Sequence, residues 1–195
     1  RGNTGILLLG LMLGYLANAG VTVLLHFGSI YRLRSYLSWS FGTFGGVTPE
    51  DLPFFVLFCS FFLGLSLLLG KSLNALLLGE TYAASMGLSL RRTRLAVFLC
   101  TAGLAGGVTA FCGPVAFLGV AVPHLCRGFF QTWDHRILLP ACLLGGGALG
   151  MGADLLTRLG PRGTLLPLNA VTALLGVPVV FWVLFRYRSS REEMS

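Results

Sequence analysis

The stretch GETYAASMGLSLRRTR, residues 79–94, decides how this chain is organised. It holds a glutamate, a tyrosine and three arginines, yet apolar runs flank it on both sides, LLLGKSLNALLL at 67–78 and LAVFLCTAGLAGG at 95–107. Long apolar runs are typical of helices that cross a bilayer. The polar stretch is therefore expected at a membrane surface, between two crossings.

The composition agrees with a membrane location. Hydrophobic residues make up 55% of the 195 residues and charged residues only 11%, whereas soluble domains carry about 25% charged residues. We interpret the chain as an all-α integral membrane protein that has the lipid bilayer as a partner. The net charge of +7 could indicate nucleic acid, but the basic residues are spread between apolar runs and form no basic face, which argues against that class.

Six segments are long and apolar enough to predict a polytopic helical bundle of about six transmembrane helices. They are residues 5–27, 52–70, 95–111, 114–130, 137–156 and 165–185. The third and fourth are separated only by Cys112-Gly113-Pro114, so a single kinked helix is the alternative there. The chain opens without Met or a signal peptide, and we expect it to be a piece of a longer polypeptide.

The basic residues predict the orientation. If the C-terminus is cytoplasmic, ten of the 14 Lys and Arg residues fall inside, as expected because cytoplasmic loops retain these residues. The four that fall outside are Arg32, Arg34, Arg158 and Arg162. Residues 72–94 are then cytoplasmic, and residues 28–51 form a periplasmic loop whose aromatic residues predict a short helix at the membrane interface.

The polar stretch itself predicts two short helices. Residues 80–86 can form two helical turns, which Gly87 ends in a left-handed conformation. Ser89 can then cap a second helix that runs into the third crossing. Tyr82, Met86 and Leu88 would form an apolar contact surface with a rim of Glu80, Arg91 and Arg92. An ordinary solvated loop is the alternative.

Several motifs resemble one family. GETYAASMGLSLRRTR is similar to the cytoplasmic coupling segment of FecCD-type permeases, the membrane subunits of bacterial ABC importers for iron–siderophores, haem and cobalamin. Later segments of the family resemble, in the same order, GPVAFLGVAVPHLCR (113–127), DHRILLP (134–140), ADLLTR (153–158) and LPLNAVTALLGVPVVFWVL (166–184). The resemblance covers nearly the whole chain. Leu165 departs from it, since many members have an acidic residue there.

The resemblance implies an architecture and partners. Family permeases have ten helices, of which this chain, as one transmembrane permease domain over residues 1–195, would hold the last six. Two copies pair as a homodimer, a cytoplasmic ABC ATPase dimer docks beneath, and a periplasmic substrate-binding protein delivers cargo. The chain has no GxxxxGK[ST] phosphate-binding loop, so we expect no cofactor, metal or catalytic residue in it. The partner ATPase would use ATP and Mg²⁺.

The resemblance also assigns site residues. The ATPase-coupling set is Gly79, Glu80, Tyr82, Ala83, Met86, Gly87, Leu88, Arg91 and Arg92. Arg158 would dock the binding protein, with Arg32, Arg34 and Arg162 in the same patch, although Asp154 is a rival partner one helical turn away from Arg158. Candidates for lining the pathway are Asn18, Thr22, Asn169 and Thr172. Helix–helix hydrogen bonds are the alternative role for these four.

The expected function is that of a multi-pass permease in the bacterial inner membrane, which imports its cargo by alternating access. An ion-coupled secondary transporter is the main alternative. It requires ionisable groups near the middle of the bilayer, and Asp154 instead lies toward the end of a crossing. An intramembrane hydrolase is a third class, but the sequence contains no GxSxG or HExxH motif.

Overall fold

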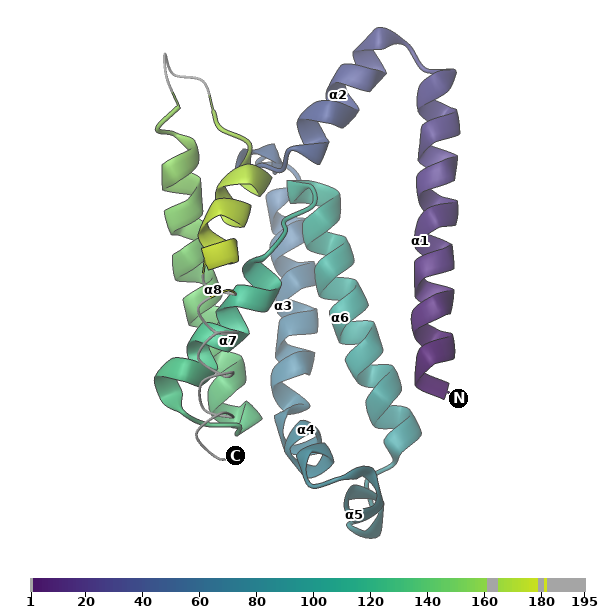
Figure 1. Ribbon diagram of the computed structural model, residues 1–195, viewed down its shortest axis with the longest axis vertical. Helices are drawn as coiled ribbons and strands as arrows, with labels where there is room; N and C mark the ends of the chain where they lie inside the picture. The colour runs from purple at the N-terminus through teal and green to yellow at the C-terminus, as the bar shows by residue number, and fades with distance from the viewer. Residues whose placement is uncertain (1, 161–164, 179–180, 182–195) are drawn as a thin grey trace. The chain divides into compact units, whose positions relative to one another are not determined.

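The computed structural model describes residues 2–160, 165–178 and 181. Contacts divide the chain into two compact units, residues 1–40 and 41–195 (Figure 1). The first unit contains α1 (Gly2–His26) and α2 (Ile30–Ser40). The second contains η1 (Phe44–Gly46), α3 (Leu52–Leu68), α4 (Gly70–Leu77), α5 (Glu80–Ser85), α6 (Leu90–Cys112), α7 (Leu118–Phe130), α8 (His135–Thr157) and a further helix, Leu168–Pro178. Within the described ranges all regular structure is helical, as the sequence predicts.

The lengths and composition of the helices confirm a polytopic membrane fold. Three helices are long and apolar enough to cross a bilayer, namely Leu7–His26 within α1, Leu90–Cys112 and His135–Thr157. The pair α3 and α4 qualifies together as a fourth crossing, which is bent by 43° at their junction. In the first unit, α2 is the short helix predicted within the 28–51 loop.

The predicted crossing at 114–130 is shorter than expected. α7 begins only at Leu118, and its 13 residues span about 20 Å, less than the roughly 30 Å of a hydrocarbon core. Residues 113–117 are not helical because the chain turns at Gly113 and again at Phe117, where φ is +78° and +66°. α6 and α7 are therefore separate helices, and the alternative of one kinked helix is wrong. Of the predicted crossing at 165–185, the structure describes the helix Leu168–Pro178.

α3 packs against α6 through phenylalanine rings that lie over glycines. A Cβ atom added at Gly103 would lie 2.6 Å from the Phe62 ring, and one added at Gly107 would lie 2.6 Å from the Phe58 ring. The same two rings also contact each other, with centroids 4.9 Å apart. Close contacts of this kind supply the dispersion attraction that holds helices together in lipid, where the hydrophobic effect between them is weak.

Alanine at Gly103 is therefore expected to destabilise the α3–α6 contact, because the Phe62 ring must move within a stack that Phe58 restricts. Overpacking of this kind costs about 1–3 kcal/mol. Gly106→Ala is the matched control on the same helix, since its Cβ would meet no atom within 4 Å. Unfolding of the purified protein by titration with a denaturing detergent measures both variants. Equal stability of the two would contradict the close packing of the Phe62 ring on Gly103.

Two apolar clusters form the interior of the second unit. The first lies between α7 and α8 and consists of Val122, Cys126 and Leu138. The second consists of Ala153, Leu168 and Val171, with Phe44 and Val115 packed against them. This second cluster joins η1, α8 and the last helix at the end of the unit that lies opposite α5 (Figure 1). The second unit therefore has two distinct ends, one carrying α5 and the other carrying η1.

Candidate functional site

Segment 79–94 is a compact helical turn between two long apolar elements. α5 ends in a complete Schellman motif, in which the N–H of Leu88 donates to the carbonyl of Ala83 (3.1 Å) and the N–H of Gly87 donates to that of Ala84 (2.9 Å). This closure requires a residue with positive φ, and Gly87 has φ +83°. The predicted helix end at Gly87 is confirmed.

The second predicted short helix is the first turn of α6. Ser89 occupies the position before that helix, but its side chain makes no capping hydrogen bond. From Leu90 the helix continues without a break to Cys112, because no glycine or proline interrupts the residues around Arg94 and Leu95. The turn is thereby connected directly to a helix that can cross the membrane.

Exposure separates the predicted coupling residues into two groups. Ala83 is fully buried and anchors α5, so it cannot itself contact a partner. Tyr82 and Met86 are 54% and 63% exposed and form an apolar surface. Arg91 and Arg92 are exposed on the first turn of α6. Segment 79–94 therefore offers apolar side chains beside positive charge.

An ion pair that the sequence does not suggest closes this segment. Arg94 Nη2 contacts Glu80 Oε1, and both side chains are more than half exposed. The two residues are 14 apart in sequence, which would place them about 21 Å apart along one continuous helix, so the reversal of the chain at the Schellman turn brings them together. The predicted charged rim is thus modified, because the Glu80 carboxylate is paired within the chain. Exposed pairs of this kind stabilise by about 1 kcal/mol or less.

A polar cluster connects α4 with the start of α8, and no pattern in the sequence indicates it. Asn74 Oδ1 accepts a hydrogen bond from the N–H of His135 at 2.7 Å, and His135 Nδ1 lies 2.9 Å from the same oxygen. The amide nitrogen of Asn74 donates to Asp134 Oδ1, which also accepts from the N–H of Arg136 at 2.8 Å and so caps α8. The bond from Asn74, followed by that from Arg136, lowers the pKa of the Asp134 carboxyl.

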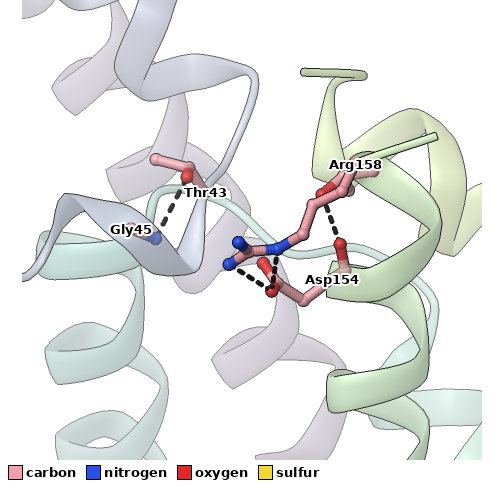
Figure 2. Close-up of polar contacts among 5 residues, drawn as sticks. Thr43, Gly45, Asp154 and Arg158 are labelled. Carbon is pink, nitrogen blue, oxygen red and sulfur yellow. Dashed lines mark hydrogen bonds and ion pairs between the residues drawn. The ribbon is translucent and has the colours of Figure 1, made fainter. Parts of the chain in front are cut away.

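At the other end of α8, Arg158 is held by Asp154. Its Nε and Nη2 lie 3.0 and 2.9 Å from the same carboxylate oxygen, Oδ2 (Figure 2). The Arg158 side chain is nevertheless 65% exposed and projects from the last turn of α8. The rival contact expected from the sequence is therefore present, but it leaves the guanidinium accessible.

The other predicted docking residues are not among the described residues of the second unit, which carries Arg158. Arg32 and Arg34 are exposed on α2 of the first unit. Two residues apart on a helix, they point to different faces. Arg162 lies outside the described residues. Their membership of one docking patch stays a prediction.

The predicted pathway residues fall in two different environments. On α1, Asn18 and Thr22 are exposed one helical turn apart, and the Thr22 hydroxyl donates to the Asn18 carbonyl at 2.9 Å. On the last helix, Thr172 is only 2% exposed and donates to the Asn169 carbonyl at 3.1 Å. Asn169 Oδ1 accepts from the N–H of Ala116 at 3.3 Å, which satisfies backbone in the non-helical 113–117 stretch. Their role in lining a pathway stays a prediction.

Known proteins are similar to this chain in sequence and in fold. The profile of the FecCD transport family matches residues 1–186. The vitamin B12 import system permease protein BtuC of Klebsiella pneumoniae subsp. pneumoniae is 36% identical over 183 residues, which cover 94% of this chain and 55% of that protein. BtuC of Photorhabdus laumondii subsp. laumondii is 37% identical over 187 residues, which cover 95% of this chain and 55% of that protein. The chain thus spans about half the length of these relatives.

A solved structure agrees with the sequence match. It is described as an inward-facing conformation of an ABC transporter of metal-chelate type, and it superposes with a TM-score of 0.86 at 27% identity. The match covers 95% of this chain and 60% of that chain. Both the sequence profile and the fold lead to one conclusion: the chain belongs to the FecCD transport family.

Proposed function

We propose that this chain is the membrane permease of an ATP-driven importer, which carries an iron siderophore, haem or cobalamin across the bacterial inner membrane by alternating access. The family supports this proposal, since two relatives are vitamin B12 import permeases and a matching structure is an ABC transporter of metal-chelate type. The observation that carries it is segment 79–94, a closed helical turn that exposes Tyr82 and Met86 between the end of α4 and the start of α6.

In the proposed importer, segment 79–94 is the surface that a cytoplasmic ATPase dimer binds. Tyr82 and Met86 fill an apolar cleft on the ATPase, and Arg91 and Arg92 meet acidic groups at its rim. ATP and Mg²⁺, held by the ATPase, supply the energy when that dimer closes. The turn moves with the ATPase, and the attached helices rock as semi-rigid bodies that open the pathway to alternate sides.

The proposed orientation places α5 in the cytoplasm, together with the C-terminus. It is supported by the excess of basic residues on that side, ten of 14. The η1 end then faces the periplasm, where Arg158 is available to an acidic residue of the binding protein. A second copy of the permease completes the pathway, to which Asn18 and Thr22 contribute exposed polar groups.

Reversing the charge at Arg158 is expected to weaken docking of the loaded binding protein. Charges at the rim of an interface mainly affect association, and a roughly tenfold rise in Kd is expected at low salt. Asp154→Asn is the matched control, because it releases Arg158 from its intrachain partner without removing the guanidinium. Surface plasmon resonance with the permease complex measures both variants. Unchanged binding by Arg158→Glu would remove this residue from the docking surface.

Uptake into proteoliposomes tests the proposed function. The full-length permease is purified together with its cognate ATPase and binding protein. Radiolabelled cobalamin, a ferric siderophore and haem are supplied in turn. Uptake of one of them is expected only with hydrolysable ATP inside and the loaded binding protein outside. Uptake that follows a proton or sodium gradient without the ATPase would instead indicate an ion-coupled transporter and overturn the proposal.

A further inference from the structure

The contact between α4 and α8 includes a polar cluster, whereas the α7–α8 cluster and the phenylalanine rings of α3 that pack on α6 are apolar. The 43° bend between α3 and α4 redirects the chain at Leu69. Gly70 and Asn74 then lie one turn apart on α4 and face α8 together. Gly70 is buried, and a Cβ atom there would lie 3.7–3.8 Å from Leu139 and Arg136. α4 therefore lies directly against the start of α8 at Gly70, and the Asn74 amide one turn later reaches the helix end.

Asn74 uses both halves of its amide on that helix end. Its oxygen accepts from the N–H of His135, the first residue of α8, at 2.7 Å. Its nitrogen donates to the Asp134 carboxylate, which caps the same helix through the N–H of Arg136. One side chain therefore holds a backbone donor and the capping residue of α8 at the same time. An amide supplies an acceptor oxygen and a donor nitrogen, and this site uses both. An apolar side chain of similar size could fill the space but could make neither hydrogen bond.

α4 and α8 connect the two ends of the second unit. α4 packs against α5 on one side and against α8 on the other. α8 is continuous over 23 residues, or about 35 Å, and carries Asp154 and Arg158 at its far end. A displacement of α5 thus has a path of direct contacts through α4 and Asn74 to the end of α8 that carries Arg158.

We infer that Asn74 is the positioning residue through which movement of segment 79–94 reaches α8. The inference rests on the proposed function, because it assigns a route for the movement that a bound ATPase would drive. Asn74 does not itself contact ATPase or cargo in this scheme. It clamps the start of α8 to α4, so the two helices move together and the periplasmic end follows the cytoplasmic end.

A swap of two side chains tests the inference in the complete importer. Asn74→Asp places a second carboxylate against Asp134, and the two repel. In the double variant Asn74→Asp/Asp134→Asn, the amide introduced at position 134 can donate to the carboxylate introduced at position 74, while its oxygen still caps α8. The N–H of His135 keeps an acceptor as well. Lys71→Gln, an exposed position on the same helix, is the control with the same change in net charge.

Two quantities separate a positioning role from a merely structural one. The first is the amount of assembled complex together with its basal ATP hydrolysis, and the second is cargo transported per ATP hydrolysed with loaded binding protein present. Asn74→Asp is expected to keep complex assembly and basal ATP hydrolysis within about twofold of wild type. It is expected to lower the cargo transported per ATP at least roughly tenfold. The swap is expected to restore the cargo transported per ATP to within about threefold of wild type. Lys71→Gln is expected to leave assembly, basal ATP hydrolysis and transport per ATP unchanged.

The outcomes are distinguishable from failure of the proposed function. If the wild-type complex shows no ATP-dependent uptake, the proposed function fails. If wild type transports but Asn74→Asp transports equally well per ATP, or if the swap stays as impaired as the single variant, the inference about Asn74 is overturned. Should Asn74→Asp not assemble, Asn74→Ala removes the hydrogen bonds of the amide without adding charge, and its transport per ATP is judged by the same criterion.

Discussion

Replacing Gly87 by valine is expected to reduce transport at least roughly tenfold while the protein remains in the membrane. Gly87 has φ +83°, and a β-branched residue is a genuine outlier there. A residue forced into such a region costs about 1–3 kcal/mol. The Schellman bonds of Gly87 and Leu88 would be lost, and α5 would no longer present Tyr82 and Met86 together. ATP-dependent uptake and the amount of permease in the membrane fraction measure the two effects.

Gly87→Asn is the matched control for this effect. A Cβ atom at Gly87 would meet nothing within 4 Å, so crowding at Cβ penalises neither substitution, and the two differ in their tolerance of positive φ. Asparagine adopts the left-handed region far more readily than valine. It is therefore expected to retain most of the transport. If both variants lost transport equally, positive φ at Gly87 would not be the cause. Any side chain at this position would then disturb the contact surface itself.

Replacing Gly176 by alanine is expected to destabilise the packing of the last helix more than Gly103→Ala destabilises the α3–α6 contact. The added Cβ would lie 2.5 Å from Cβ of Phe117. Because Cβ is fixed by the backbone, no change of rotamer relieves the clash. Phe117 itself has φ +66°, so its backbone has little freedom to adjust. A loss of about 3 kcal/mol in the free energy of unfolding is expected, measured by detergent titration of the purified permease.

Two further variants make this prediction specific. Gly119→Ala, on the adjoining α7, is the control, since its Cβ would have no neighbour within 4 Å. Phe117→Gly in the Gly176→Ala background removes the atom that clashes and accepts the positive φ. The double variant is therefore expected to be more stable than the sum of the two single effects predicts. Strictly additive losses would show that the two positions do not contact each other.

Features with a local chemical cause can be predicted from the sequence. The helix end at Gly87 follows from one residue that tolerates positive φ, and the long apolar helices follow from composition over about 20 residues. The late start of α7 cannot be predicted in this way, because the chain remains apolar from Val115 onward although its backbone is not helical. One backbone donor of that stretch, the N–H of Ala116, is satisfied by the amide of Asn169, which is 53 residues away.

The polar contacts between distant residues escape prediction for a related reason. Asn74 and His135 are 61 residues apart, and their pairing depends on the bend between α3 and α4 and on how α4 packs against α8. Neither property is encoded in a spacing. Arg158 and Asp154, in contrast, lie one helical turn apart, and the i, i+4 rule anticipates their pairing.

The closure of segment 79–94 has a consequence for how such proteins can be recombined. Its Schellman bonds and its ion pair are all made between residues of this one segment. Residues 79–94 grafted into a relative would therefore bring with them the contacts that close the turn. Asn74 and Asp134, in contrast, lie on different segments of the chain. A chimera of two relatives that are joined at a point between these positions must therefore keep a compatible pair of side chains.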